Sequence, residues 1–195
     1  MVGWQSGPVA LRTTGEREVG VSLVDGVRAG LRTLVAGIDR AGQEAAAADH
    51  GARQAAAHAV AVGFVGVAQN VAGVREVIGQ IQAGIGGLAV HTSETATALA
   101  NVPQQPTPQE VIATLAPVAE KLTRLHDGVA GCIGLVDQAR QMTATVLRGG
   151  DPGALLARLD AIQQVLAAVG HQGTTTRRQV EAAIAEARKT GGSGN

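Results

Sequence analysis

The stretch "AVGFVGVAQNV" (61–71) contains the one phenylalanine of the chain, Phe64, between Gly63 and Gly66. Long segments of helix-compatible residues, rich in Ala and Val, lie on either side of it. A glycine can end a helix in the left-handed conformation, and an apolar residue directly after it can fold back on the last helical turn. The stretch therefore predicts the turn of a helical hairpin at 63–66, with a new helix starting near Val65.

Apolar and small residues recur at alternating steps of three and four, the spacing that keeps side chains on one face of a helix. The pattern covers residues 31–62, 67–99, 111–146 and 155–183. It is weakest in the last segment, around Gly173 and Thr176. A mean step of 3.5 over several heptads is typical of coiled-coil packing. We predict an all-α protein of four long helices, arranged as two antiparallel coiled-coil-like hairpins in an elongated helical bundle.

Local signals set the expected boundaries of these helices. "NVPQQPTP" (101–108) contains three prolines and cannot continue a helix. "TPQE" (107–110) has the spacing of a capping box, and "RGGDPG" (148–153) can stop one helix and start the next. The predicted organisation is a flexible N-terminal segment (1–20), a first hairpin (21–100), a Pro-rich linker (101–108), a second hairpin (109–189, turn near 148–153) and a flexible tail (190–195).

Two alternatives to the turn at 63–66 stay open. Gly84, Gly86 and Gly87 form a competing break point. The second alternative is a single unbroken helix from about 22 to 100. In a monomer such a helix would leave its apolar stripe exposed.

Composition and charge exclude several classes of function. The chain has 16 basic and 16 acidic residues, so it lacks the positive surface expected of a nucleic-acid-binding protein. Its aromatic residues are Trp4 and Phe64, and its single cysteine, Cys132, allows neither an internal disulfide nor a multi-cysteine metal site. Cys132 lies on an apolar stripe, where we expect a buried and inert thiol.

The sequence offers no arrangement of residues for catalysis. The five histidines are at least eight residues apart, which is not the spacing of helical metal ligands. The acidic residues are scattered and several neighbour arginines, as on a solvated helix face. "GIGG" (84–87) lacks the lysine and the preceding strand of a phosphate-binding loop. We expect a protein that is not an enzyme and that has no metal, cofactor or catalytic residue.

Residues 54–74 contain no charged side chain and have the length of a membrane-spanning helix. They include Gln54, His58, Gln69 and Asn70, and much of the remainder is Ala and Gly, so membrane insertion is not the expectation. A membrane-associated hairpin that uses this segment is the alternative function.

Small residues suggest how the helices could meet a partner. An Ala-rich seam (41–59), together with Gly73, Gly84 and Gly87, permits close approach of helix backbones. The seam is either internal to a hairpin or open to a partner helix. We expect a non-catalytic scaffold or partner-binding protein that acts through helix–helix seams, with itself or another helical protein as partner, and Gly63, Phe64 and Gly66 as its turn and contact residues.

Two resemblances add to this interpretation. Phe64-Val65-Gly66, followed by Val67 and Ala68, resembles the turn motif of the Trp-Xaa-Gly helical-hairpin proteins of type VII (ESX-like) secretion, over residues 22–100. That resemblance implies a helical hairpin. We expect a cytoplasmic protein, and the resemblance leaves secretion without a signal peptide as an alternative. "GFVGVAQ", "VPQQPTPQE", "RGGDPGALLARLDAI" and "VEAAIAEAR" resemble uncharacterised all-helical proteins of actinobacteria, which implies the architecture and no known activity.

Overall fold

The computed structural model describes residues 10–100, 106–147 and 152–192, with side chains described from residue 24 onward. These residues form four helices: α1 (Ala10–Ala61), α2 (Val65–Ala100), α3 (Pro108–Val146) and α4 (Gly153–Gly192). They are 52, 36, 39 and 40 residues long. The described residues include no strand. The prediction of an all-α protein with four long helices is confirmed.

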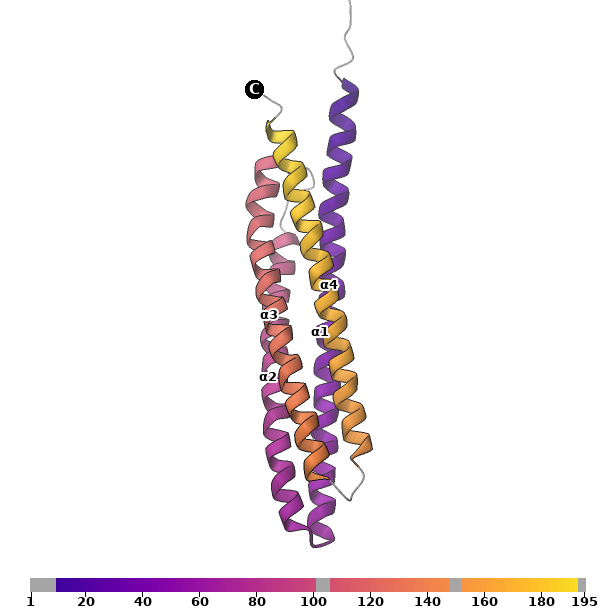
Figure 1. Cartoon of the computed structure of the whole chain (residues 1–195). Coiled ribbons are helices and arrows are strands. Elements are labelled where there is room, and N and C mark those ends of the chain that lie inside the picture. The colour runs from indigo at the N-terminus through magenta and orange to yellow at the C-terminus, as the bar shows by residue number, and fades with distance from the viewer. Residues whose placement is uncertain (1–9, 101–105, 148–151, 193–195) are drawn as a thin grey trace, which may run out of the picture.

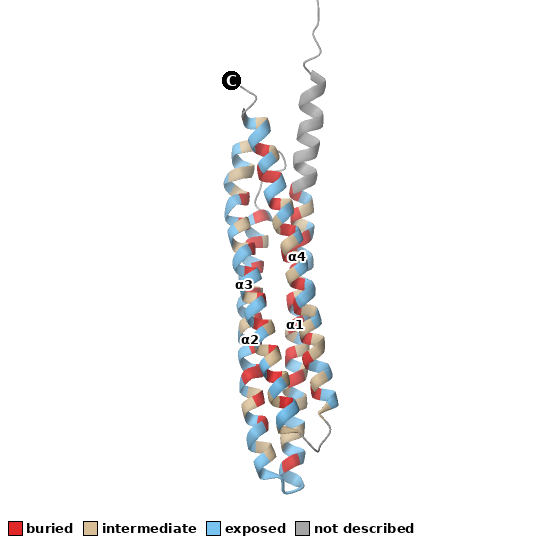
Figure 2. Cartoon of the chain, viewed as in Figure 1, coloured by how far each residue is buried: buried red, intermediate tan, exposed pale blue. Residues whose placement is uncertain are grey.

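The four helices form one elongated antiparallel bundle (Figure 1). The backbone of α1 lies next to those of α2 and α4, and the backbone of α3 lies next to those of α2 and α4, while the described parts of the diagonal pairs are not backbone neighbours. α4 therefore returns beside α1 and closes the bundle. The two hairpins expected from the sequence share a single core, which contains buried residues from all four helices. Figure 2 shows this buried face running along the inside of the bundle.

Glycines let the helices approach closely at several levels of the core. A methyl group added at Gly30 would overlap Thr176 of α4. One added at Gly84 would lie 2.7 Å from Cys132 Sγ of α3. The weak part of the fourth stripe thus has a physical reason, because the Thr176 side chain fills the space left by a glycine on the neighbouring helix.

The Ala-rich seam of α1 belongs to the inside of the bundle. Ala41, Ala45, Ala48 and Ala52 are completely buried in the shared core. Of the two possibilities left open by the sequence, this part of the seam is internal and offers no free surface to another helix.

Two boundaries differ from those expected. α1 begins at Ala10, inside the segment predicted to be flexible, and α4 continues to Gly192, into the predicted tail. A helix tolerates an internal glycine at a cost of about 1 kcal/mol, so Gly15 and Gly20 do not end α1. The start of the N-terminal segment (1–9), most of the linker (101–105), the centre of the second turn (148–151) and the end of the tail (193–195) lie outside the described residues.

The start of α3 has the predicted capping box. The Glu110 backbone N–H donates to Thr107 Oγ1 at 3.3 Å, and the Thr107 backbone N–H donates to Glu110 Oε2 at 2.7 Å. The bond from the Thr107 backbone, assisted by one from its hydroxyl, lowers the pKa of the Glu110 carboxyl. α3 then continues through Pro117 to Val146.

Candidate functional site

The chain turns between α1 and α2 at Gly63. Its φ of +85° is the one positive φ among the described residues, and it lies in the region that favours glycine. The Phe64 N–H donates to the Ala59 carbonyl at 2.8 Å, and the Gly63 N–H donates to the Val60 carbonyl at 3.0 Å. This pair of bonds is the Schellman motif that closes the carboxyl end of a helix. Because α2 then runs unbroken from Val65 to Ala100, the break at 84–87 and the single unbroken helix are both excluded.

Large apolar side chains gather on the outside of this turn. Phe64 is 64% exposed, and Val60, Val62 and Val65 are each more than half exposed. Among the described residues, one other large hydrophobic side chain, Val90, is exposed to this degree. The position of Phe64 after the capping glycine had suggested that its ring folds back onto the last turn of α1. Most of the ring instead faces solvent.

We call residues 59–68 the tip. They read "AVAVGFVGVA" and contain no side chain that can form a hydrogen bond. Figure 1 shows that this part of the α1–α2 hairpin extends beyond the end of α3 and the start of α4, and Figure 2 shows it as the exposed end of the molecule. The core stripe of α1 reaches the tip through Ala59, which is 6% exposed, and ends at Val62, which is 51% exposed. The tip thus carries apolar surface that the described parts of α3 and α4 do not cover.

An ion-pair cluster fixes the two helices behind the tip. The Asp49 carboxylate of α1 accepts from Arg53 on the same helix and, at 3.1 Å, from Arg75 Nε on α2. Partial burial raises the pKa of this carboxyl, but the hydrogen bonds and positive charges of Arg75 and Arg53 outweigh that effect and lower it overall. Between Arg53 and Arg75 no residue is charged, so this cluster marks where the charged surface begins.

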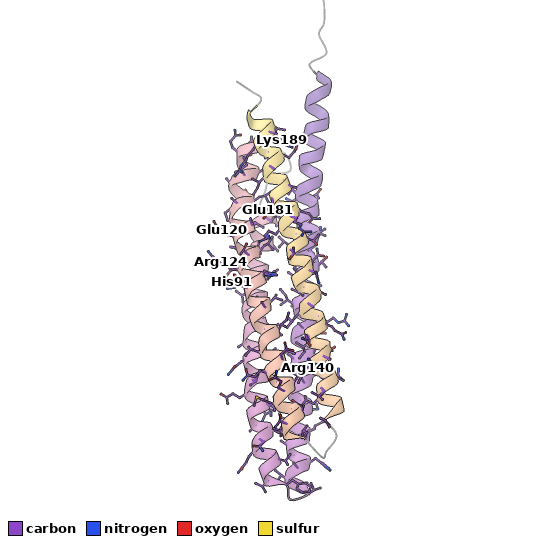
Figure 3. The ribbon with its side chains drawn as sticks, viewed as in Figure 1. His91, Glu120, Arg124, Arg140, Glu181 and Lys189 are labelled. Carbon is purple, nitrogen blue, oxygen red and sulfur yellow. The ribbon has the colours of Figure 1, made fainter. Side chains whose placement is uncertain are left out.

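Charged side chains elsewhere hold the helices together or face solvent. Arg140 of α3 pairs with Asp160 of α4 at 2.7 Å, and Arg158 of α4 pairs with Glu44 of α1 at 3.2 Å. In Figure 3 the labelled charged residues are spread along the bundle, and none of them lies at the tip. These pairs link neighbouring helices at the surface and assemble no reactive centre among the described residues.

The described residues do not bring ligating or nucleophilic side chains together. No group of three His, Cys, Asp or Glu residues among them could hold a metal ion. The Cys132 thiol is buried in the core, where desolvation raises its pKa and disfavours the reactive thiolate. His50 contacts Gln54, and His91 lies 3.9 Å from Glu94 on the same exposed helix face.

The structure places all three residues singled out in the sequence at this end of the molecule. Gly63 and Phe64 form the turn, and Gly66 lies exposed in the first turn of α2. Sequence reasoning missed Val60, Val62 and Val65 as surface residues. The signal for them was present, because apolar residues occupy every position from 59 to 68 instead of one helix face.

Comparison with known protein families finds a match in the second half of the chain. Residues 106–192, which span α3 and α4, match a family of unknown function (DUF6244). The tip lies outside the matched residues. No curated protein matches the chain. Among the described residues, none of the helices combines the length and hydrophobicity needed to cross a bilayer.

Proposed function

We propose that this protein is a non-catalytic helical scaffold that binds a protein partner through the tip of its α1–α2 hairpin. The observation that carries the proposal is the exposure of Val60, Val62, Phe64 and Val65 at one end of the bundle. Exposed apolar patches of a few hundred Å² on soluble proteins often mark interaction sites. An aromatic side chain at the centre of such a patch is the type of residue that dominates binding energy.

The tip is better suited to binding than the helix–helix seams expected from the sequence. The Ala41–Ala52 part of the α1 seam is buried in the core, so a partner could use it only after the bundle opened. The tip needs no such rearrangement, because its side chains are already in water. Its helices are fixed by the Gly63 turn and the Asp49 cluster, which limits the conformational entropy lost on binding.

A role without catalysis fits the same geometry. Catalytic centres combine a nucleophile or base with groups that orient it, in a concave and partly buried site. The tip projects from the end of the bundle and has no polar side chain. The Phe64-Val65-Gly66 motif lies at this turn, which is also where the resemblance to the Trp-Xaa-Gly hairpin proteins puts it. On that ground the proposal includes an ESX-like role for this protein itself.

Site-specific photocrosslinking tests this proposal. A photoreactive benzoylphenylalanine replaces Phe64 in one variant and the exposed Ala168 of α4 in the control, and both are expressed in the native host. We expect covalent adducts with a protein from position 64 and none from position 168. Equal labelling from the two positions, or none from position 64, would contradict binding through the tip.

A further inference from the structure

We infer that the partner of the tip is a second copy of this chain, with the two tips side by side and antiparallel about a two-fold axis. This inference rests on the proposed function, since it names the partner of the same surface. Two helical hairpins, one from each copy, would then form a short four-helix arrangement between the ends of two bundles.

The first support is that the core seam continues into the tip. Along α1 the buried stripe passes through Ala52 and Ala59 and ends at the exposed Val62. Along α2 it passes through the buried Val71 and ends at the half-buried Val67. In the rest of the bundle the hairpin of α3 and α4 covers this face. At the tip the described parts of α3 and α4 no longer provide this cover, and a second α1–α2 hairpin has the helical form needed to replace it.

The second support is the absence of charge in the tip. Two copies of one surface repel each other when that surface carries a net charge, and residues 54–74 carry none. The first charges, at Arg53 and Arg75, are about ten residues from the turn, or about 15 Å at 1.5 Å per residue. Two tips that overlap by one or two helical turns keep these clusters more than a Debye length of about 8 Å apart. Self-association therefore meets no electrostatic barrier.

The size of the tip sets the expected strength of this contact. A stable interface uses about 20–30 residues and about 800 Å² from each partner. The tip has far fewer residues, so the interface belongs to the small, transient class. We expect a reversible dimer of micromolar or weaker affinity, which forms and dissociates with concentration.

Sedimentation equilibrium over roughly 5–500 µM protein tests the inference. We expect the weight-average mass to rise from 19.6 kDa toward twice that value as concentration increases. Val62→Glu puts a charge where the α1 stripe enters the contact and should keep the protein monomeric throughout. Val90→Glu is the matched control, because Val90 is equally exposed but lies on α2 away from the tip, and it should dimerise like the unmodified chain. Circular dichroism of both variants checks that they are folded.

Three results would overturn the inference. The first is a mass of 19.6 kDa at every concentration. The second is dimerisation that Val90→Glu abolishes and Val62→Glu leaves intact, which would put the interface elsewhere. The third is a monomer that floats with phosphatidylcholine or phosphatidylserine vesicles and loses this property on Phe64→Ala, which would make lipid the partner.

The photocrosslinking experiment separates this failure from failure of the proposed function. A monomeric chain that still crosslinks from position 64 to another protein keeps the tip as a protein-binding site and removes only the second copy. A monomeric chain without crosslinks removes both.

Discussion

Gly63 ends α1 because its backbone adopts a φ of +85°, which most residues reach only at an energetic cost. A methyl group added at this position would meet no atom within 4 Å beyond its chain neighbours. Any loss of stability on substitution therefore comes from the backbone alone. Gly66, two residues into α2, also has open space for a side chain but does not have a positive φ. The two glycines thus form a natural pair for separating backbone strain from packing.

We expect Gly63→Ala to lower the free energy of unfolding by about 1–2 kcal/mol, the cost of a left-handed alanine. Gly66→Ala should raise it by a few tenths to about 1 kcal/mol, because alanine is the better helix former. Chemical denaturation of both variants measures these changes. A stabilised Gly63→Ala variant would mean that α1 and α2 continue into one another in solution.

Phe64→Ala should leave the stability of the monomer nearly unchanged, within about 0.5 kcal/mol, as is usual for surface substitutions. The reason is that the ring is 64% exposed and loses little packing when removed. Thermal melts at low micromolar concentration, where dimers are scarce, make the measurement. A loss of the size seen for buried aromatic residues, about 3–5 kcal/mol, would show that the ring packs against the bundle in solution.

Residue-scale features differ in how far the sequence reveals them. The position of Gly63 between two apolar stripes favoured a turn at 63–66, but the glycines at 84–87 left a second break point open, and the φ of +85° at Gly63 decides between them. The exposure of Phe64 was not accessible in the same way. A phenylalanine next to a helix end can pack back onto that helix or project into solvent. Whether other helices cover it depends on how far α3 and α4 extend along the bundle.

At the scale of elements, neighbouring helices are joined by close contacts of small residues and by charged pairs at the surface. Gly84 of α2 faces Cys132 of α3, and Gly128 of α3 faces Leu88 of α2. Each glycine leaves space for one larger side chain on the facing helix. The stripes were visible in the sequence, but the partner of each glycine was not, since the spacing within one helix carries no information on which helix it will meet.

Gly84→Ala should destabilise the bundle by about 1–3 kcal/mol, the usual cost of overpacking, because the added methyl group would lie 2.7 Å from Cys132 Sγ. Combining it with Cys132→Ala removes the sulfur and should restore part of the loss. Denaturation of both single variants and the double variant gives the coupling energy. Simple addition of the two effects would indicate that these residues do not touch.

The ion pair between α1 and α2 predicts a dependence of stability on pH. The folded state lowers the pKa of Asp49, so its contribution is complete above the unfolded pKa of about 3.9 and is lost as the pH falls through the lower folded value. We expect the stability difference between the unmodified chain and Asp49→Asn to be constant from pH 7 to pH 5 and to shrink below pH 4. Urea titrations across that range measure it. A difference that grows on acidification would contradict the pairing with Arg53 and Arg75.

At the scale of the whole molecule, the two hairpins form one bundle in which every helix has two neighbours. The four stripes predicted the helices because a heptad spacing has to be buried against another helix. They did not predict that α4 returns to α1, since two separate hairpins would give the same spacing. The free tip is a consequence of this arrangement, because α3 ends, and α4 begins, before the level of the α1–α2 turn.

The shared core predicts that neither hairpin is stable alone. Separated fragments 1–100 and 106–192 would each leave exposed the face that the other covers, including Leu31 and Leu34 in one and Leu159 and Ile162 in the other. We expect each fragment to self-associate or to melt without a sharp transition, and an equimolar mixture to recover a cooperative one. Circular dichroism melts with sedimentation analysis make this measurement. If residues 106–192, the part that matches the family of unknown function, instead melted cooperatively as a monomer near the midpoint of the whole chain, α3 and α4 would be an independent unit. The α1–α2 hairpin would then be an attachment to that unit, and the bundle would not fold as one.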